Sequence, residues 1–284
     1  MIYIITPVFN RKEFTRNYLL ALDKQTDDNF ETIIVDDGST DGTFEMIKEE
    51  FPDVILLRED GDLWWAEATN VGVRYALEHD ASYIMTLNDD TIPQEDYMES
   101  MIKHSQLEPK ACLGALAIDN ASGKVVYGGG THSWKNGKTV QLLDTLDEND
   151  YKGLHEVNFF PGRGLLIPRE VFDNIGLYDS KNFPQTVADY DFTYRIINAG
   201  YKIYCNYDAK IKIFPDESAV NKIRNNKSLK NYYNHLFSLR GGGNLIFFTK
   251  VTLKNCPKKY LAQYLFIGIS RRLFGYLRDW IFSK

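Results

Sequence analysis

Two clusters of polar residues have types and spacing that suit a ligand site. Asp36 and Asp37 form the first, and Asn88, Asp89 and Asp90 form the second; each cluster directly follows an apolar run of strand length. A carboxylate can accept the N–H of a pyrimidine ring or a ribose hydroxyl. One or two carboxylates, completed by water and substrate phosphates, typically hold Mg²⁺ or Mn²⁺. The clusters therefore predict a nucleoside site at the first and a metal-bound diphosphate at the second.

Both clusters also have a purely structural interpretation. Residues 38–41 (GSTD) read as a turn whose short oxygens cap the following helix. Asp89 and Asp90 would be anions at a helix N-terminus, with Thr91 as its cap and Pro93 in its first turn. Such anions contribute at most about 1 kcal/mol. This alternative leaves one acid of the second cluster unexplained.

The elements that carry the clusters alternate between strand and helix patterns. The predicted pairs are 2–6 with 12–24, 32–35 with 42–50, 54–57 with 66–79, and 83–87 with 94–106. We expect an α/β domain with a mostly parallel central sheet, in which the loops after these strands share one rim. Farther along, a strand and a helix from Pro168 to Gly176 are predicted, then a helix over 189–199. The loops between about 119 and 160 are expected to set specificity.

Composition excludes several classes of protein. The chain has 284 residues, with 33 Lys and Arg against 39 Asp and Glu, and it lacks the basic surface of a nucleic-acid binder. Three dispersed cysteines, Cys112, Cys205 and Cys256, suit reduced thiols rather than a disulfide framework or metal cage. The start MIYIITPVFN has no basic segment typical of a signal peptide, so we expect a cytoplasmic protein.

Six short motifs in a fixed order resemble those of the family 2 glycosyltransferases, and within them the rhamnosyltransferase-like bacterial members. The motifs are TPVFN (6–10), VDDGSTDGT (35–43), NVGVRYAL (70–77), LNDDT (87–91), PGRGLLIPREVFDNIGLYD (161–179) and ADYDFTYRIINAGYK (188–202). The resemblance covers about residues 2–215. It implies the GT-A fold, a nucleotide-diphospho-sugar donor, a divalent metal (Mn²⁺ or Mg²⁺) and inversion at the anomeric carbon.

The resemblance also implies roles for the first cluster. Thr6 and Pro7 lie where the family's first loop lines the nucleotide pocket. Asp37 matches the acid that meets the pyrimidine base, with Asp36 beside it. Asn70 is assigned to the same nucleotide site.

The second cluster falls on the family's Asp-x-Asp motif. In that motif the last acid, here Asp90, ligates the metal, and the first usually contacts ribose. Asn88 replaces the first aspartate of the motif. Asp89 is its middle residue, and both are assigned to nucleotide binding. An asparagine still hydrogen-bonds a ribose hydroxyl, but it removes a charge near the metal.

The family's catalytic base lies where this chain reads ADYDF. Asp189 matches the base and Asp191 the second acid, and the choice between them stays open with Asp189 preferred. Ala188 replaces a glutamate found in most members. Many members also carry a metal-binding histidine in the strand that follows; KIKIFPDES has none, so Asp216 or water would take its place.

Other residues have two interpretations each. Trp64 and Trp65 follow a polar rim loop and are candidates for a wall against the substrate, but aromatic pairs also fill cores. Arg163 would meet the diphosphate or the acceptor, or it has no role beyond exposure. Arg195 lies four residues after Asp191, which favours an ion pair on the helix.

The domain prediction separates a catalytic domain, 1–215, from a helical extension, 216–284. Within the first, about 1–110 is the nucleotide half and about 111–215 the acceptor half. Near the end an apolar stripe, joined by Tyr264, Tyr276 and Trp280, runs in four-residue steps through Leu261, Leu265, Ile269, Leu273 and Leu277. Arginines interrupt it well short of the ~20 apolar residues of a membrane span. Residues 258–282 therefore dock on the catalytic domain or lie at a membrane surface.

The leading hypothesis is an inverting glycosyltransferase of bacterial surface polysaccharide synthesis. It would transfer a sugar from a UDP- or dTDP-linked donor, with dTDP-rhamnose as one candidate, to a hydroxyl of a glycan or lipid-linked acceptor. One alternative is a degenerate, non-catalytic sugar-nucleotide binding module, suggested by Asn88, Ala188 and the missing histidine. Another is a sugar nucleotidyltransferase, although TPVFNRKEF is not the Gly-rich basic loop typical of that class.

Overall fold

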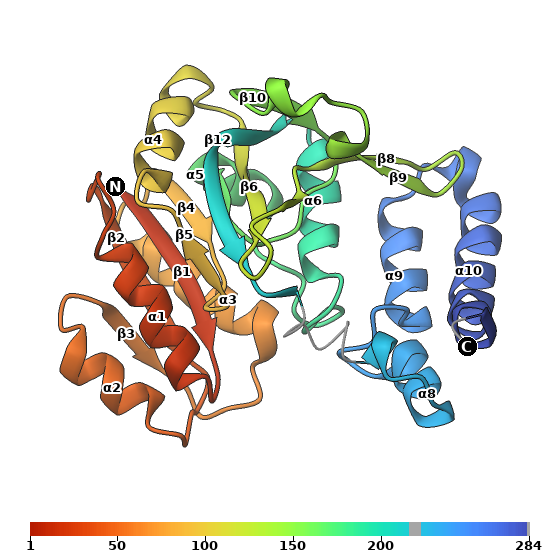
Figure 1. Ribbon diagram of the computed structural model, residues 1–284, viewed down its shortest axis with the longest axis horizontal. Coiled ribbons are helices and arrows are strands. Elements are labelled where there is room, and N and C mark those ends of the chain that lie inside the picture. Colours follow the sequence, from red (N-terminus) through yellow and green to blue (C-terminus); the bar gives the residue numbers. More distant parts are fainter. Residues whose placement is uncertain (216–222, 283–284) are drawn as a thin grey trace.

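The computed structural model describes residues 1–215 and 223–282. Its core is one ten-stranded sheet with the order β10-β12-β6-β11-β4-β1-β2-β3, in which β5 also pairs with β12 and β7 with β6 (Figure 1). The strands of this sheet are β1 (Ile2–Val8), β2 (Phe30–Asp36), β3 (Ile55–Arg58), β4 (Tyr83–Thr86), β5 (Thr91–Pro93), β6 (Cys112–Asp119), β7 (Val125–Tyr127), β10 (Leu154–Val157), β11 (Leu165–Pro168) and β12 (Ile203–Ile213). A separate hairpin consists of β8 (Gly130–Ser133) and β9 (Lys138–Gln141).

Helices cover both faces of the sheet and form a further layer at one end of the molecule (Figure 1). Those of the sheet layer are α1 (Lys12–Leu22), α2 (Thr43–Glu50), α3 (Trp64–Glu78), α4 (Tyr97–Leu107), α5 (Arg169–Ile175) and α6 (Ala188–Asn198). The end layer contains α8 (Leu229–Phe237), α9 (Leu245–Asn255) and α10 (Leu261–Phe282). Short 3₁₀ turns are η1 (Leu142–Asp144), η2 (Glu148–Asp150) and η4 (Lys258–Tyr260).

The central strands run parallel and end at one edge. In β3-β2-β1-β4 every pairing is parallel, and the register places Val8 opposite Asp36, which in turn lies opposite Arg58. β11 is antiparallel to its neighbours, and β6 and β12 are again parallel. Alternate residues of β1 enter different cores, Ile5 on one face and Ile4 on the other. The predicted α/β fold with a mainly parallel central sheet flanked by helices is confirmed.

One local prediction after β4 was wrong. Thr91 does not cap a helix and Pro93 is not in a helical turn; both belong to β5, which pairs antiparallel with β12. α4 begins only at Tyr97, after Asp96. Proline is tolerated in β5 because this short strand pairs on one side, with β12. Consequently Asp89 and Asp90 are not anions at the N-terminus of that helix.

The side of α10 that carries Tyr264 and Tyr276 packs on the other helices of the end layer and on the β8–β9 hairpin. Tyr264 stacks on Phe248 of α9, with ring centroids 5.7 Å apart. Tyr276 is buried beside Tyr232 of α8. Arg271 donates a hydrogen bond to the carbonyl of Gly137 in the β8–β9 turn. This side of α10 is therefore packed against the protein.

The length and hydropathy of the helices bear on the membrane question. Within residues 1–215 and 223–282, none is both long enough and apolar enough to cross a bilayer. The predicted substitute for the family's histidine, Asp216, lies outside the described residues.

Candidate active site

The turn after β2 is anchored by Asp36. Its carboxylate is fully buried, accepts a hydrogen bond from the Ser39 amide (2.9 Å) and pairs with the Arg58 guanidinium (3.0 Å). Gly38 has φ +79°, and a Cβ there would lie 3.0 Å from the backbone nitrogen of Gly61. Only glycine suits this conformation and this close approach. The turn therefore holds the next residue, Asp37, at the rim.

Asp37 joins three rim segments. Its carboxylate accepts hydrogen bonds from the backbone amides of Leu63 (3.0 Å) and Trp64 (3.1 Å) where α3 begins. Its own amide donates to the carbonyl of Val8 at the end of β1 (3.0 Å). Burial raises the pKa of Asp37 above its ordinary value, and the two amide bonds oppose that shift.

Asp41 performs the capping role that the sequence suggested for this turn. Its carboxylate accepts from the amide of Thr43 at the start of α2 (3.0 Å) and from that of Lys12 at the start of α1 (3.1 Å). One side chain thus satisfies free amides of two helices. Asp41 therefore caps these helices, and neither Asp36 nor Asp37 is needed for capping.

Thr6 and Pro7, predicted to line the nucleotide pocket from the first loop, lie within β1. The hydroxyl of Thr6 is buried against the hydroxyl of Tyr18, 2.7 Å away. Pro7 is half-buried next to it at the carboxyl end of β1. Of this pair, Pro7 therefore has the exposed side chain at the rim.

The two acids of the second cluster contact Arg11, a residue that was not predicted from the sequence. Its guanidinium lies 3.3 Å from Asp89 and 3.5 Å from Asp90. Burial raises the pKa of Asp89 to about 7, with Asp90 adding to the rise and Arg11 opposing it. The signal that could have identified Arg11 is its position just after the first strand, on the rim that also receives the acids.

Trp65 links the second cluster to Gly162, which in turn lies against the predicted base. Its indole Nε1 donates to Oδ1 of Asn88 (3.0 Å). The same ring packs on Gly162, where a Cβ would lie 2.9 Å from the indole and 3.2 Å from Cβ of Asp189. Asn88, Trp65, Gly162 and Asp189 therefore form a continuous row, although they come from segments far apart in the sequence.

Asp189 lies in the first turn of α6 and faces this row. One carboxylate oxygen accepts from the Gly162 amide (3.3 Å) and the other from the Tyr190 amide (2.9 Å). Desolvation raises the pKa of Asp189, while these two bonds and the charge of Arg163 act in the opposite direction. Arg163 is half-exposed on the same loop as Gly162 and lines a small pocket with Tyr127.

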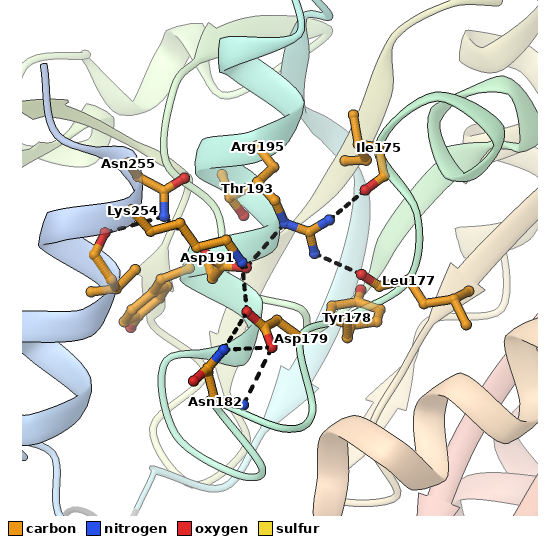
Figure 2. A network of polar contacts seen from close by, with 12 residues as sticks. Ile175, Leu177, Tyr178, Asp179, Asn182, Asp191, Thr193, Arg195, Lys254 and Asn255 are labelled. Atoms are coloured by element: carbon orange, nitrogen blue, oxygen red, sulfur yellow. Dashed lines mark hydrogen bonds and ion pairs between the residues drawn. The ribbon is translucent and has the colours of Figure 1, made fainter.

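Asp191 belongs to an ion-pair network with Arg195 and Lys254 (Figure 2). It is fully buried and is contacted by Arg195 (3.0 Å), Lys254 (2.9 Å) and Asn255 (2.8 Å). Lys254 also contacts Asp179 at 2.7 Å. The expected pair of Asp191 with Arg195 is present, and α9 supplies the other two partners.

Asn70 is not brought into the row. Its side-chain amide donates to the carbonyl of Tyr178 and accepts from the amide of the same residue, both at 2.9 Å. Asn70 is almost fully buried in this arrangement. Asn70 therefore holds the backbone at Tyr178, which lies 108 residues away in the sequence.

Two strained backbone positions flank the site. Trp64, the first residue of α3, has φ +60°, and Val187, the N-cap of α6, has φ +76°. Bulky and β-branched residues rarely adopt positive φ, which costs on the order of 1–3 kcal/mol and is most often found at functional sites. The ring of Trp64 also faces Arg240, with 5.5 Å between the guanidinium carbon and the ring centroid.

The residues of the rim fit a divalent cation held by one protein carboxylate. Within the described part of the chain there is no cluster of three or more His, Cys, Asp or Glu side chains arranged to hold a metal. However, Oδ1 of Asp90 is buried and has no hydrogen-bond partner there. An unpaired buried carboxylate oxygen is unusual, and water, an ion or another ligand can supply the missing partner. A Mg²⁺ or Mn²⁺ ion completed by water and substrate phosphates meets that need.

Comparisons with known sequences give consistent results. A family model described as glycosyl transferase family 2 matches residues 3–176. The chain is 23% identical over 212 residues to the glycosyltransferase AglE of Haloferax volcanii, which covers 72% of this chain and 64% of that protein. It is 32% identical over 104 residues to GlyA of Streptococcus pneumoniae, covering 36% and 14%. It is 24% identical over 179 residues to the dTDP-rhamnosyl transferase RfbF of Shigella flexneri, covering 63% and 58%. The chain thus spans less than two thirds of each of these relatives.

Solved structures share the fold. The crystal structure of GalNAc-T7 with UDP, GalNAc and Mn²⁺ superposes with a TM-score of 0.62 at 13% identity, covering 100% of this chain and 57% of that one. S. aureus TarS gives a TM-score of 0.60 at 12% identity, covering 98% and 55%. At these identities the likeness concerns the fold alone. The GT-A fold implied by the sequence motifs is confirmed.

Proposed function

The chain belongs to glycosyl transferase family 2, and we propose that it is an inverting enzyme that transfers a sugar from a nucleotide-diphospho-sugar to a hydroxyl of a glycan or lipid-linked acceptor. The observation that carries this proposal is the row from Asn88 through Trp65 and Gly162 to Asp189. This row connects Asn88, from the motif expected to bind the donor, with Asp189, a carboxylate that can act as a base. An active site of this kind needs both groups within the reach of one sugar.

The donor binds on the rim formed by β1, β2 and β4. Asp37 accepts the N–H of a pyrimidine ring next to Pro7, and Asn88 meets a ribose hydroxyl. Asp36 stabilises the turn after β2 through its ion pair with Arg58. The dTDP-rhamnosyl transferase among the relatives supports a dTDP-linked donor, with rhamnose as the first sugar to test. The structural neighbour that was solved with UDP makes UDP-sugars the second class.

A divalent metal, Mn²⁺ or Mg²⁺, would be held by Asp90. When bound, it supplies Lewis-acid stabilisation of the negative charge that gathers on the departing nucleoside diphosphate. The orphaned Oδ1 of Asp90 supports this role. Asp89 and Arg11 lie behind Asp90 and fix the orientation of its carboxylate and the local charge.

Asp189 acts as the general base. An acceptor hydroxyl is a poor nucleophile until a carboxylate at about 2.6–3.2 Å takes its proton. The new bond forms from the acceptor oxygen to the anomeric carbon, the bond from that carbon to the diphosphate oxygen breaks, and the proton stays on Asp189. Attack and departure take place on opposite faces, so the anomeric configuration inverts. The amides of Gly162 and Tyr190 orient the carboxylate for this step.

Asp191 is a positioning residue in this proposal. Its two cationic partners and Asn255 occupy its carboxylate, so it is not free to accept a substrate proton. It holds the first turn of α6, and with it Asp189, against α9. The catalytic role that the motif left open between the two acids is therefore assigned to Asp189.

Three further side chains are candidates for contacts with the sugar or acceptor. Trp65 forms a wall between Asn88 and Gly162, where its ring can pack against a sugar face. Trp64 lies next to it, and Arg163 lines the small pocket beside Gly162. Arg163 has no ion-pair partner in the described segments, which leaves its guanidinium free for a phosphate or an acceptor hydroxyl.

The test is a transfer assay with the purified full chain. dTDP-rhamnose and a panel of UDP-sugars are incubated with Mn²⁺ and with simple glycan or lipid-linked acceptors, and release of nucleoside diphosphate is measured. We expect release with one pyrimidine donor class and a product of inverted anomeric configuration by NMR. A retained configuration would contradict the single displacement on Asp189.

The same assay distinguishes the second candidate function, a non-catalytic binding module. That alternative is favoured by Ala188 and Asn88, which replace acids of the family motif. It predicts binding of the nucleotide without measurable turnover of any donor. Turnover that is lost in Asp189→Asn would exclude it.

A further inference from the structure

The helix α10 has a second apolar face, opposite the one that docks. Phe266, Phe274 and Ile281 remain 74%, 65% and 68% exposed. They are spaced by eight and seven residues, which places them on one side of an α-helix. The buried residues Gly268 and Tyr276 lie on the other side. α10 is at the end of the molecule, with α9 between it and the sheet (Figure 1).

The charge of the chain is divided sharply along the sequence. Residues 216–284 contain 13 Lys and Arg against three Asp and Glu, a formal charge of +10. Residues 1–215 contain 20 against 36, a formal charge of −16. The net charge of the whole chain, −6, conceals this division. Asp179 and Asp191 neutralise Lys254 within the chain. The positive charge that remains on this segment indicates an anionic partner.

Basic side chains lie next to the exposed apolar face. Arg278 is 72% exposed and pairs with Asp279 at 3.0 Å. It is spaced four residues after Phe274 and three before Ile281, so the three are neighbours on the helix surface. Lys258 and Lys259 are exposed just before the helix begins. Apolar aromatic side chains with adjacent cations are the pattern of a helix that lies in a membrane interface.

We propose that this face of α10, defined by Phe266, Phe274 and Ile281 with Lys258, Lys259 and Arg278, binds the surface of an anionic membrane. The helix lies parallel to the bilayer, its apolar side chains reach the headgroup level, and the cations meet lipid phosphates. A second copy of the chain fits this face poorly, because a symmetric contact would bring two +10 segments together. The proposal does not depend on the donor or on the catalytic base.

The test measures the binding of purified full-length protein to vesicles by cosedimentation. Vesicles of phosphatidylcholine alone are compared with vesicles that contain one quarter phosphatidylglycerol, at low and high salt. We expect binding to the anionic vesicles only, and loss of that binding at high salt, because Lys and Arg act within a screened surface potential. Equal binding to both vesicles, or none to either, would overturn the proposal.

Variants separate the apolar from the charged contribution. Phe266→Ser with Phe274→Ser is expected to lower the partition coefficient about tenfold or more. Lys258→Gln with Lys259→Gln is expected to lower it about fivefold for each charge removed. Leu107→Ser and Lys110→Gln are matched controls, since both residues are exposed near the end of α4. Controls that lose as much binding as the α10 variants would contradict the assignment.

Two further measurements keep the outcome interpretable. The thermal unfolding of each variant must match that of the wild type, which is expected because the substituted side chains are exposed. Sedimentation velocity at two concentrations tests whether a second copy of the chain covers this face instead of a membrane. A dimer that disappears in Phe266→Ser with Phe274→Ser would assign the face to a second copy instead. Transfer activity with a soluble acceptor is expected to be unchanged in these variants, so failure here is distinct from failure of the proposed function.

Discussion

Asp189 and Asp191 lie two positions apart on α6 but have different surroundings. Asp189 is held by two backbone amides beside Trp65, whereas Asp191 is enclosed by two cations and an asparagine. A base needs a carboxylate oxygen that faces the substrate, and the partners of Asp191 already occupy its carboxylate. The contacts, rather than the motif, therefore separate the two roles.

Replacing the base should affect turnover and leave donor binding intact. Asp189→Asn keeps the shape of the side chain but cannot accept the proton, so kcat should fall by about 10²- to 10⁴-fold. The dissociation constant of the nucleoside diphosphate should stay the same, measured by calorimetry. Asp173→Asn, an exposed acid on α5, is the control. If donor affinity falls along with kcat, Asp189 belongs to donor binding and the assignment is wrong.

The pH profile should report the same carboxylate. In the proposed mechanism transfer needs unprotonated Asp189, so kcat should rise as pH increases through its pKa. Because desolvation raises the pKa of Asp189, the midpoint of this acidic limb should lie above about 3.9, the value for an ordinary aspartate. The measurement is kcat from pH 4 to pH 8 for the wild type and for Asp189→Asn. An identical limb in the residual activity of the variant would show that another group titrates.

At the scale of elements, α9 holds α6 in place through Lys254. Its ammonium group bridges Asp179 and Asp191, which come from the loop before α6 and from the helix itself (Figure 2). Phe247 and Val251 of the same helix are buried in the apolar cluster that contains Phe192 of α6. Polar and apolar contacts thus act together at this interface.

Removing that bridge should cost stability and some turnover. Lys254→Met keeps the alkyl stem but leaves Asp191 with one cationic partner. Breaking a buried pair costs about 3–5 kcal/mol, and partial exposure of Lys254 lowers the expectation to about 2 kcal/mol in the free energy of unfolding. Urea unfolding gives this number, and kcat should fall while the donor KM stays constant.

Lys250→Met is the matched control for this change. Lys250 lies one turn earlier on α9, is exposed, and donates a hydrogen bond to the side chain of Asn182 (3.2 Å). Its replacement should change the free energy of unfolding by less than about 0.5 kcal/mol. Equal effects of the two substitutions would show that the network around Asp191 has no special role.

How much could be predicted from sequence depended on the range of the contacts. The strand and helix units of the first hundred residues were predictable because hydrophobic periodicity is local. Thr91 and Pro93 were placed in a helix because their partner β12 lies more than a hundred residues away. Asn70 was assigned to the nucleotide for the same reason, since its partner Tyr178 is distant in sequence. Lys254 and Asn255, which settle the surroundings of Asp191, also come from a remote segment.

On the scale of the whole molecule, the helices after residue 223 share a core with the sheet domain. Phe183 meets Phe247 edge-to-face, with ring centroids 6.2 Å apart. Thr186 donates to the carbonyl of Leu239 (3.0 Å). A boundary at residue 215 therefore separates segments that are packed together.

The full chain should accordingly unfold in one cooperative transition. Calorimetric and van't Hoff enthalpies should agree, as for a two-state protein. A chain of residues 1–215 should unfold at a lower temperature, because Asp191 loses Lys254 and Asn255 and because Phe183 loses its apolar cover. Two resolved transitions in the full chain, or an unchanged midpoint in the shorter one, would show that the predicted catalytic domain is independent.

We propose that the rim formed by Asp37, Asn88 and Asp90 binds a pyrimidine nucleoside diphosphate through a divalent metal. The most direct measurement is calorimetric titration of the wild type with UDP, dTDP and GDP, with ATP as a control, each with and without Mn²⁺. We expect UDP or dTDP to bind only with Mn²⁺, and Asp90→Asn to lose the metal dependence together with most of the affinity. Absence of binding by all three diphosphates, or binding that is the same with and without Mn²⁺ and in Asp90→Asn, would contradict the claim and leave the two acidic clusters with a structural role only.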